Sequence, residues 1–104
     1  MNYLTDLQKI IQSKKNGDPN QSYTAQLFFK GLEEIQKKFG EEAIELIIAS
    51  ASKNKTQTIY ESADVLFHLL VLLTENNISI EEIVDELKKR SGVSGLEEKY
   101  NRKK

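Results

Sequence analysis

Apolar residues recur at intervals of three and four along most of this chain, which is the spacing of one face of an α-helix. The pattern predicts a first helix over residues 2–14, with Leu4, Leu7 and Ile11 on one side. A break rich in asparagine, with one glycine and the only proline, follows at 15–20. No stretch alternates apolar and polar residues over a convincing length. We therefore expect an all-α fold, a bundle of four to five helices.

The second helical segment is interrupted by glycines. Ser22 is a suitable N-cap, and the helical pattern then continues over 23–53. Gly31 and Gly40 lie inside it, and each would cost about 1 kcal/mol relative to alanine in a helix interior. One of them is expected to mark a kink or a division into two helices, but the sequence does not choose between them.

The rest of the chain completes one domain over 1–104. Helices are expected at 56–75 and from the cap at Ser79 to about Arg90. The polar segment 92–104 has Leu96 as its main apolar anchor. Hydrophobic residues make up 38% of the chain, which is lean for a compact monomer with long apolar stripes. We therefore expect a homo-oligomer, in the simplest case a homodimer.

Composition narrows the classes of partner. The formal net charge is −1, which gives no attraction towards nucleic acid or an anionic membrane. The absence of cysteine excludes disulfides and thiolate metal sites. The longest apolar run, 65–73, is far shorter than the roughly 20 residues needed to span a bilayer. Polar residues interrupt the N-terminal segment where a signal peptide would be apolar, so a cytoplasmic protein is expected.

Acidic residues occur on an apolar helix face. In the helix expected at 56–75, Glu61, Asp64 and His68 fall within an arc of about 60°. Val65 lies on the same side, and no charged residue interrupts the run from Val65 to position 73. The two carboxylates are therefore expected to project towards packed structure.

The preceding helix repeats this arrangement. Glu41 and Glu45 are four residues apart and share a face with Ile44, and Glu42 lies at its edge. If the two helices pack side by side, up to five carboxylates converge. Ionised carboxylates are costly to bury without a partner, and a divalent cation removes that conflict. Ligation by oxygen alone favours Mg²⁺ or Mn²⁺.

Simpler interpretations exist for each of these features. Acidic pairs are common on solvated faces, and that is the preferred interpretation for three other pairs. His68 is either a hydrogen-bonded core residue or a partner that orients a carboxylate or a water. The lysines before the acidic cluster either line a solvated face or stabilise a departing pyrophosphate. The acidic pairs are Glu33-Glu34, Glu81-Glu82 and Glu97-Glu98, and the lysines are Lys30, Lys37 and Lys38.

Glu41-Glu42-x-x-Glu45 followed by Glu61-x-x-Asp64 resembles the signature of the all-α nucleoside triphosphate pyrophosphohydrolases. The chain is most similar to the phosphoribosyl-ATP pyrophosphatase family of histidine biosynthesis. The resemblance covers nearly the whole chain, although Phe67 stands where tyrosine is common. The motifs that carry it are Ser22-Tyr23-Thr24, Lys30-Gly31, Lys37–Glu42, Glu61–Leu73, Arg90-Ser91-Gly92 and Ser94–Lys99.

The resemblance implies cleavage of phosphoribosyl-ATP at its α–β phosphoanhydride, giving phosphoribosyl-AMP and pyrophosphate. It also implies a dimeric helical bundle with magnesium in the carboxylate cluster. Glu42 is then a ligand or the base for the attacking water, and Lys38 a candidate for stabilising the leaving group. The expected metal ligands are Glu41, Glu42, Glu45, Glu61 and Asp64, and the expected substrate contacts are Ser22, Tyr23, Thr24, Lys30, Lys37, Lys38, His68 and Arg90.

Two rival functions fit parts of the pattern. A hydrolase of the same superfamily that removes dUTP or damaged nucleotides would share the metal chemistry and differ in the base pocket. A helical interaction module without catalysis would leave the acids structural or solvated, and it predicts no response to Mg²⁺.

Overall fold

The computed structural model describes residues 2–91, and this part of the chain is entirely helical with connecting turns, which confirms the all-α expectation. The expected C-terminal motif Ser94–Lys99 and the anchor Leu96 lie outside the described residues. The five helices are α1 (Tyr3–Ser13), α2 (Tyr23–Lys30), α3 (Leu32–Ala51), α4 (Lys55–Glu75) and α5 (Ile80–Arg90).

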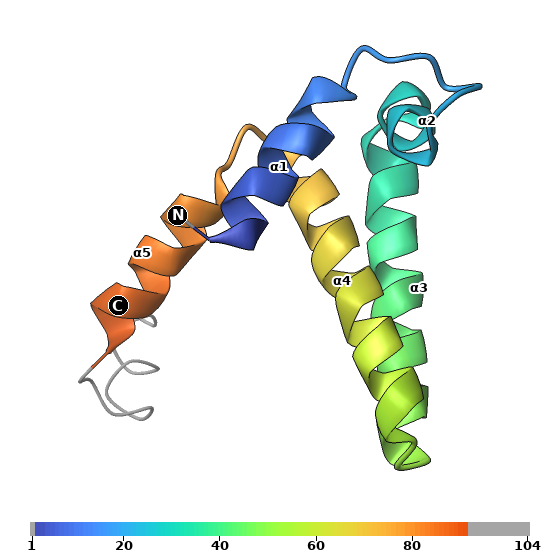
Figure 1. The fold of residues 1–104 in the computed structure, drawn as a ribbon, viewed down its shortest axis with the longest axis vertical. Coiled ribbons are helices and arrows are strands. Elements are labelled where there is room, and N and C mark those ends of the chain that lie inside the picture. The colour runs from blue at the N-terminus through green and yellow to red at the C-terminus, as the bar shows by residue number, and fades with distance from the viewer. Residues whose placement is uncertain (1, 92–104) are drawn as a thin grey trace.

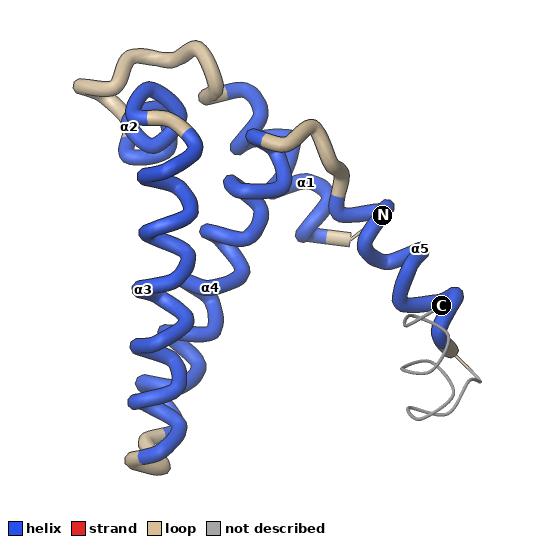
Figure 2. The backbone as a smooth tube through the Cα atoms, turned by 180° about the vertical axis from the view of Figure 1, so that it is seen from behind, coloured by secondary structure: helices blue, strands red, loops and turns tan. Residues whose placement is uncertain are grey.

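Two long helices form the main arm of the fold. A short turn joins α3 to α4, and the two helices run back along each other for most of their length (Figure 1). The short helix α2 lies across the start of α3, while α1 packs on the C-terminal half of α4 and α5 packs on α1. The arm made of α1 and α5 diverges from the α3–α4 arm, so the described chain has the outline of an inverted V. The view from behind shows the same separation (Figure 2).

Four of the five helices begin at a side-chain cap. In each, the side-chain oxygen of the residue before the helix accepts a hydrogen bond from a backbone N–H of the first turn. The α5 cap is a full capping box, in which Glu82 also accepts from the backbone N–H of Ser79. The sequence correctly places two of these caps, at Ser22 and Ser79. The four capping residues are Asn2, Ser22, Asn54 and Ser79.

Gly31 separates α2 from α3. Its backbone has φ 98° and ψ −177°, a region open almost only to glycine, and its N–H still bonds to the carbonyl of Leu27. The next helix starts directly afterwards, so the chain changes direction at one residue. Gly40 lies in the middle of α3 and does not interrupt it. The helical pattern over 23–53 is therefore two helices, and of the two glycines that could mark a kink or a division, Gly31 is the one that divides it.

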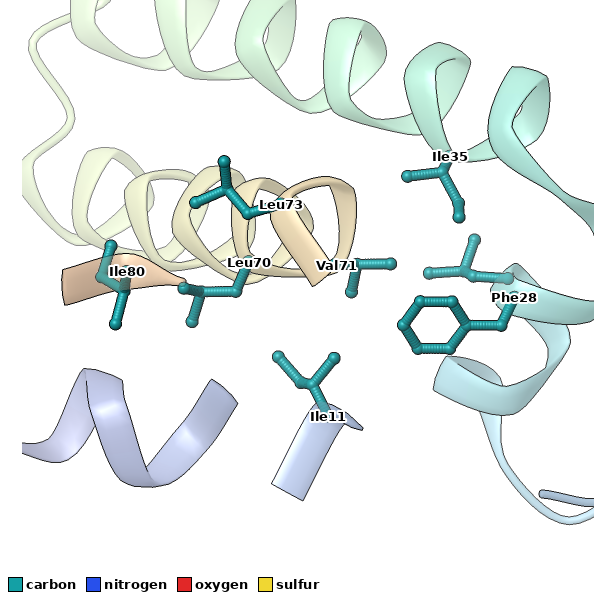
Figure 3. Close-up of a cluster of buried hydrophobic side chains, with 8 residues drawn as sticks. Ile11, Phe28, Ile35, Leu70, Val71, Leu73 and Ile80 are labelled. Atoms are coloured by element: carbon teal, nitrogen blue, oxygen red, sulfur yellow. The ribbon is translucent and has the colours of Figure 1, made fainter. Parts of the chain in front are cut away.

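The hydrophobic core lies where the two arms meet (Figure 3). All five helices contribute to it, and burying each large aliphatic side chain contributes about 1.5–3 kcal/mol. Val71 and Ile35 are fully buried, and they join the C-terminal half of α4 to the N-terminal half of α3. The core residues are Ile11, Leu27, Phe28, Ile35, Leu70, Val71, Leu73 and Ile80.

Gln8 ties α1 to the turn between α4 and α5. Its amide nitrogen donates to the hydroxyl of Thr74 at 3.1 Å and to the carbonyl of Ile78 at 2.9 Å. Its amide oxygen accepts from the backbone N–H of Ile80 at 2.7 Å. One side chain therefore satisfies polar groups at the end of α4 and the start of α5.

Among the described residues, no single helix is both long enough and apolar enough to cross a membrane. Only α4 and α5 taken together pass that test, and the chain bends by 106° between them.

We expect replacement of Gly31 by alanine to destabilise the protein by about 1–3 kcal/mol. The fold requires φ 98° at this position, and a residue with a Cβ atom is strained at that angle. No atom lies within 4 Å of that Cβ, so the loss would come from the backbone alone. Gly40→Ala is the matched control, since its Cβ also meets nothing and it lies within a helix. Chemical denaturation should show that it stabilises the protein by about 0.5–1 kcal/mol. Equal effects of the two substitutions would contradict this account of the α2–α3 junction.

Candidate active site

Three carboxylates converge between α3 and α4. One oxygen from each of Glu42, Glu45 and Glu61 lies within 4.8 Å of the other two. Glu42 and Glu61 are buried, with 9% and 6% of their surface exposed, whereas Glu45 is exposed. The three residues can therefore hold an ion that enters from the side of Glu45. The sequence predicted that acids of these two helices converge, and the structure confirms this for Glu42, Glu45 and Glu61.

Glu61 has one oxygen with a partner and one without. The side-chain amide of Gln57, one turn earlier on α4, donates to Oε2 at 2.8 Å. The other oxygen, Oε1, is buried and has no hydrogen-bond partner among the described residues. A buried carboxylate oxygen without a donor is unfavourable unless a cation or water completes it. This orphaned atom is a position at which a cation could complete the cluster.

Glu42 is electrostatically strained by its neighbours. Burial raises its pKa, and the nearby charges of Glu45 and Asp64 raise it further. His68 opposes this rise only in part. A divalent cation would relieve this repulsion. Asp64 is not one of the three residues whose oxygens meet, so its assignment as a metal ligand stays a prediction.

Glu41 points to a different partner. Its carboxylate lies 3.2 Å from the ammonium of Lys38, one turn earlier on α3, and both side chains are partly exposed. This ion pair is the main reason that the pKa of Lys38 is raised. Glu41 is not one of the three residues whose oxygens meet, so its assignment as a metal ligand stays a prediction.

An aromatic group closes the site towards α2. The hydroxyl of Tyr23 lies 3.0 Å from Nε2 of His68, and Nδ1 of His68 lies 2.8 Å from the backbone carbonyl of Asp64. Phe67 packs edge-on to the imidazole, with ring centroids 5.2 Å apart. His68 is 5% exposed and hydrogen-bonded through both nitrogens, which confirms the interpretation of a hydrogen-bonded core residue. Its partners are a tyrosine hydroxyl and a backbone carbonyl, so a role in orienting a carboxylate or a water stays a prediction.

The other predicted substrate contacts are spread over three helices. Ser22 uses its hydroxyl to accept from Ala25 N–H at 3.1 Å as the cap of α2. Arg90 pairs with Glu86 at 3.1 Å in the last turn of α5, a helix whose main contact is with α1. Their roles in binding stay predictions, as do those of Thr24 on α2, Lys30 at its end and Lys37 on α3.

A cavity of about 270 Å³ opens beside the acidic cluster. Sequence reasoning missed one of its residues, Gln57, because a lone glutamine carries no pattern. Its position four residues before Glu61, on the same face of α4, is the signal that could have revealed it. The lining residues are Glu45, Ile48, Ala49, Ser52, Gln57 and Glu61.

Comparison with known proteins agrees with this geometry. The sequence profile described as phosphoribosyl-ATP pyrophosphohydrolase matches residues 4–91, which include all of α2 to α5, α1 from its second residue, and every carboxylate of the cluster. The chain belongs to the phosphoribosyl-ATP pyrophosphohydrolase family. This match confirms the resemblance drawn from the sequence alone.

Individual relatives extend the match to nearly the full length. A phosphoribosyl-ATP pyrophosphatase of Rhodobacter capsulatus is 44% identical over 98% of this chain and 99% of its own length. The protein of the same name from Paramagnetospirillum magneticum is 45% identical over 97% of this chain and 93% of its own. That from Neisseria meningitidis is 44% identical over 95% of this chain and 92% of its own.

The raised pKa of Glu42 predicts a pH-dependent stability in the metal-free protein. Unfolding returns the carboxyl to its ordinary pKa of 4.5, so the unfolded chain loses its proton first as the pH rises. Glu42 therefore favours folding below that value, and the benefit is lost as the pH rises through the folded pKa. Glu42→Gln should gain stability relative to the unmodified protein as the pH rises.

Urea denaturation in the presence of a chelator, at pH values from about 4 to 8, measures this difference. Glu33→Gln, at an exposed position in the first turn of α3, is the control and should keep nearly the unmodified pH dependence. A Glu42→Gln profile parallel to that of the unmodified protein would refute the electrostatic description of the cluster.

Proposed function

We propose that this protein hydrolyses phosphoribosyl-ATP to phosphoribosyl-AMP and pyrophosphate, as the second step of histidine biosynthesis, in the cytoplasm. Membership of the family supports the substrate, because the relatives carry that activity in their names. The observation that supports the chemistry is the group of Glu42, Glu45 and Glu61 with one buried oxygen left without a donor. No such arrangement is expected of a helical module that only binds another protein.

We infer that the cluster holds Mg²⁺, with Mn²⁺ as a substitute. The donor set of carboxylate oxygens suits a hard cation, and Glu45, Glu61 and Asp64 are proposed as ligands together with Glu42 and Glu41. A cation held there would supply positive charge that offsets the charge developing on the phosphates in the transition state. Gln57 holds Glu61 so that its free oxygen remains available to the ion.

Glu42 is the proposed acceptor of the proton from the attacking water, unless it serves only as a ligand. Its carboxyl combines burial with a raised pKa, which brings its proton affinity closer to neutral pH. Lys38 lies one turn away on the same helix and keeps its positive charge through the pair with Glu41. It is the proposed stabiliser of the departing pyrophosphate, with Lys37 as its neighbour on α3.

The nucleotide is proposed to lie towards α2. Tyr23 contacts His68 at that edge of the cluster, and Ser22 and Thr24 flank it. Lys30 and Arg90 are proposed to contact parts of the substrate farther from the carboxylates, on the basis of the family resemblance alone.

Pyrophosphate release tests the proposal directly. The protein would be incubated with phosphoribosyl-ATP, dUTP or ATP, each with Mg²⁺ and with chelator. Fast, metal-dependent release from phosphoribosyl-ATP alone is the expected result. Release from dUTP instead would support the metal-dependent hydrolysis but contradict a role in histidine biosynthesis. Release from none of the three would refute the proposal that the protein is an enzyme of this class.

Replacing Glu45 or Asp64 by alanine should lower the rate of pyrophosphate release below one tenth of that of the unmodified protein, because each removes a proposed ligand. Helix content measured by circular dichroism should stay unchanged. Glu33→Ala, on the exposed first turn of α3, is the matched control and should keep its rate. A rate above one tenth in either variant would show that the residue is not a ligand.

We further propose that the chain works as a homodimer. The core cluster takes only Ile35 from α3 and only the C-terminal half of α4, and in the rest of the described α3–α4 arm the only buried apolar side chain is the small Ala49. Isoleucines in that part of the arm are more than half exposed, and one of them, Ile48, lines the cavity beside the acids. A second copy would cover them and complete the rim of the site. The exposed side chains are Ile44, Ile47 and Ile48 on α3 and Ile59 on α4.

Ile47→Glu should weaken the dimer by at least about tenfold in Kd, because it would bury an unpaired charge in the interface. Sedimentation equilibrium over a range of concentrations measures the change. Gln12→Glu adds the same charge at an exposed position of α1 and should leave the dimer intact. A chain that is monomeric without any substitution would refute the proposal.

A further inference from the structure

The tautomer of His68 is set by its backbone contact. Nδ1 lies 2.8 Å from the carbonyl oxygen of Asp64, and a carbonyl can only accept. In the neutral imidazole, Nδ1 therefore carries the proton and Nε2 carries the lone pair. Nε2 in turn lies 3.0 Å from the hydroxyl of Tyr23, so the hydroxyl must donate its proton to the ring.

This arrangement fixes what Tyr23 can offer to a ligand. Its only proton is directed at His68, which is buried, and the phenol oxygen retains lone pairs on a side chain that is about half exposed. Burial raises the pKa of Tyr23, and so do the charges of Glu42 and Asp64, although Lys38 opposes them, so the phenol keeps its proton. Tyr23 is therefore a hydrogen-bond acceptor beside the acidic cluster.

An acceptor selects its partners. Phosphate oxygens at neutral pH also accept, so the Tyr23 oxygen cannot bind them while His68 holds its proton. Water beside the carboxylates can donate, and so can the hydroxyl groups of a ribose. Tyr23 lies beside these carboxylates, because its hydroxyl contacts His68 at 3.0 Å and the same imidazole contacts the backbone carbonyl of Asp64 at 2.8 Å.

We propose that Tyr23 accepts a hydrogen bond from the attacking water and orients it, and that His68 is the positioning residue that fixes Tyr23 as an acceptor. This inference rests on the proposed hydrolysis and assigns a role in it to the α2 edge of the site. Tyr23 would direct one proton of the water, leaving the other for the carboxylate that takes it.

Nuclear magnetic resonance tests the pair without any substrate. His68 is the only histidine of the chain, so the ¹⁵N spectrum contains a single imidazole. At neutral pH we expect one protonated nitrogen, Nδ1, and one bare nitrogen, Nε2, whose signal shifts when Tyr23→Phe removes the donor. A proton on Nε2, or on both nitrogens, would overturn the proposal. So would an Nε2 signal that does not respond to Tyr23→Phe.

Kinetics test the role in turnover. Tyr23→Phe should lower kcat about tenfold, the effect of one lost hydrogen bond in the transition state, with KM changed less than about twofold. His68→Asn keeps a donor near Nδ1 but offers nothing at the Nε2 position, so it should show the same loss. His68→Gln places an amide oxygen there and should recover most of the rate. The double variant Tyr23→Phe/His68→Asn should be no slower than either single variant, because the two residues act as one unit.

The controls separate this inference from the activity on which it rests. Tyr3→Phe removes a hydroxyl from an exposed tyrosine of α1 and should leave kcat unchanged. A rise in KM with unchanged kcat in Tyr23→Phe would point to a ribose hydroxyl and overturn the assignment to water. A loss in His68→Asn without one in Tyr23→Phe would reduce His68 to a structural residue. If the unmodified protein released no pyrophosphate, the proposed function and the water assignment would both fail. The hydrogen bond from Tyr23 to His68, if the spectrum confirms it, would then remain only as a structural contact.

Discussion

Burial of like charges between α3 and α4 is the constraint on which the rest of the structure depends. Glu42 and Glu61 are buried in the helix interface, and the charges of Glu45 and Asp64 disfavour the ionised form of Glu42 there. The apolar core at the far end of the α3–α4 arm offsets that cost. One half of the α3–α4 pair therefore carries the apolar packing that stabilises the fold, and the other half carries the carboxylates. The packing in the apolar half keeps the two helices aligned in the acidic half.

The same division explains the shape of the chain. Where α4 meets α1, α2 and α5, its side chains are buried on several sides, and the cluster around Val71 and Ile35 fills that junction. Towards the α3–α4 turn, each helix has only the other as a neighbour among residues 2–91 (Figure 1). The isoleucines in this part of the two helices are exposed. A site placed in that half is open to a large charged substrate, and a second copy of the chain can supply the wall that a single copy lacks.

Much of this could be predicted from the sequence, and what could not be was set by contacts distant along the chain. Helical periodicity located four helical segments, one of which contains both α2 and α3. The spacing of the acids showed which of them share a helix face, so Glu45 and Glu61 were expected to converge if the two helices packed side by side. Both signals are local in the sequence. The division at Gly31 was not decided, since a glycine in a helix and a glycine at φ 98° look alike in one sequence. The Tyr23–His68 contact spans 45 residues and depends on how α2 crosses α3, which no spacing reveals.

The contacts of Gln8 also constrain the order in which the chain can assemble. Its three hydrogen bonds reach residues 66, 70 and 72 positions further along, so α1 has no polar partner until almost all of the described chain has been synthesised. The α3–α4 hairpin, with contacts between neighbouring helices, can close earlier. Of the five described helices, the one that is synthesised first is therefore the one whose polar tertiary contacts can form last.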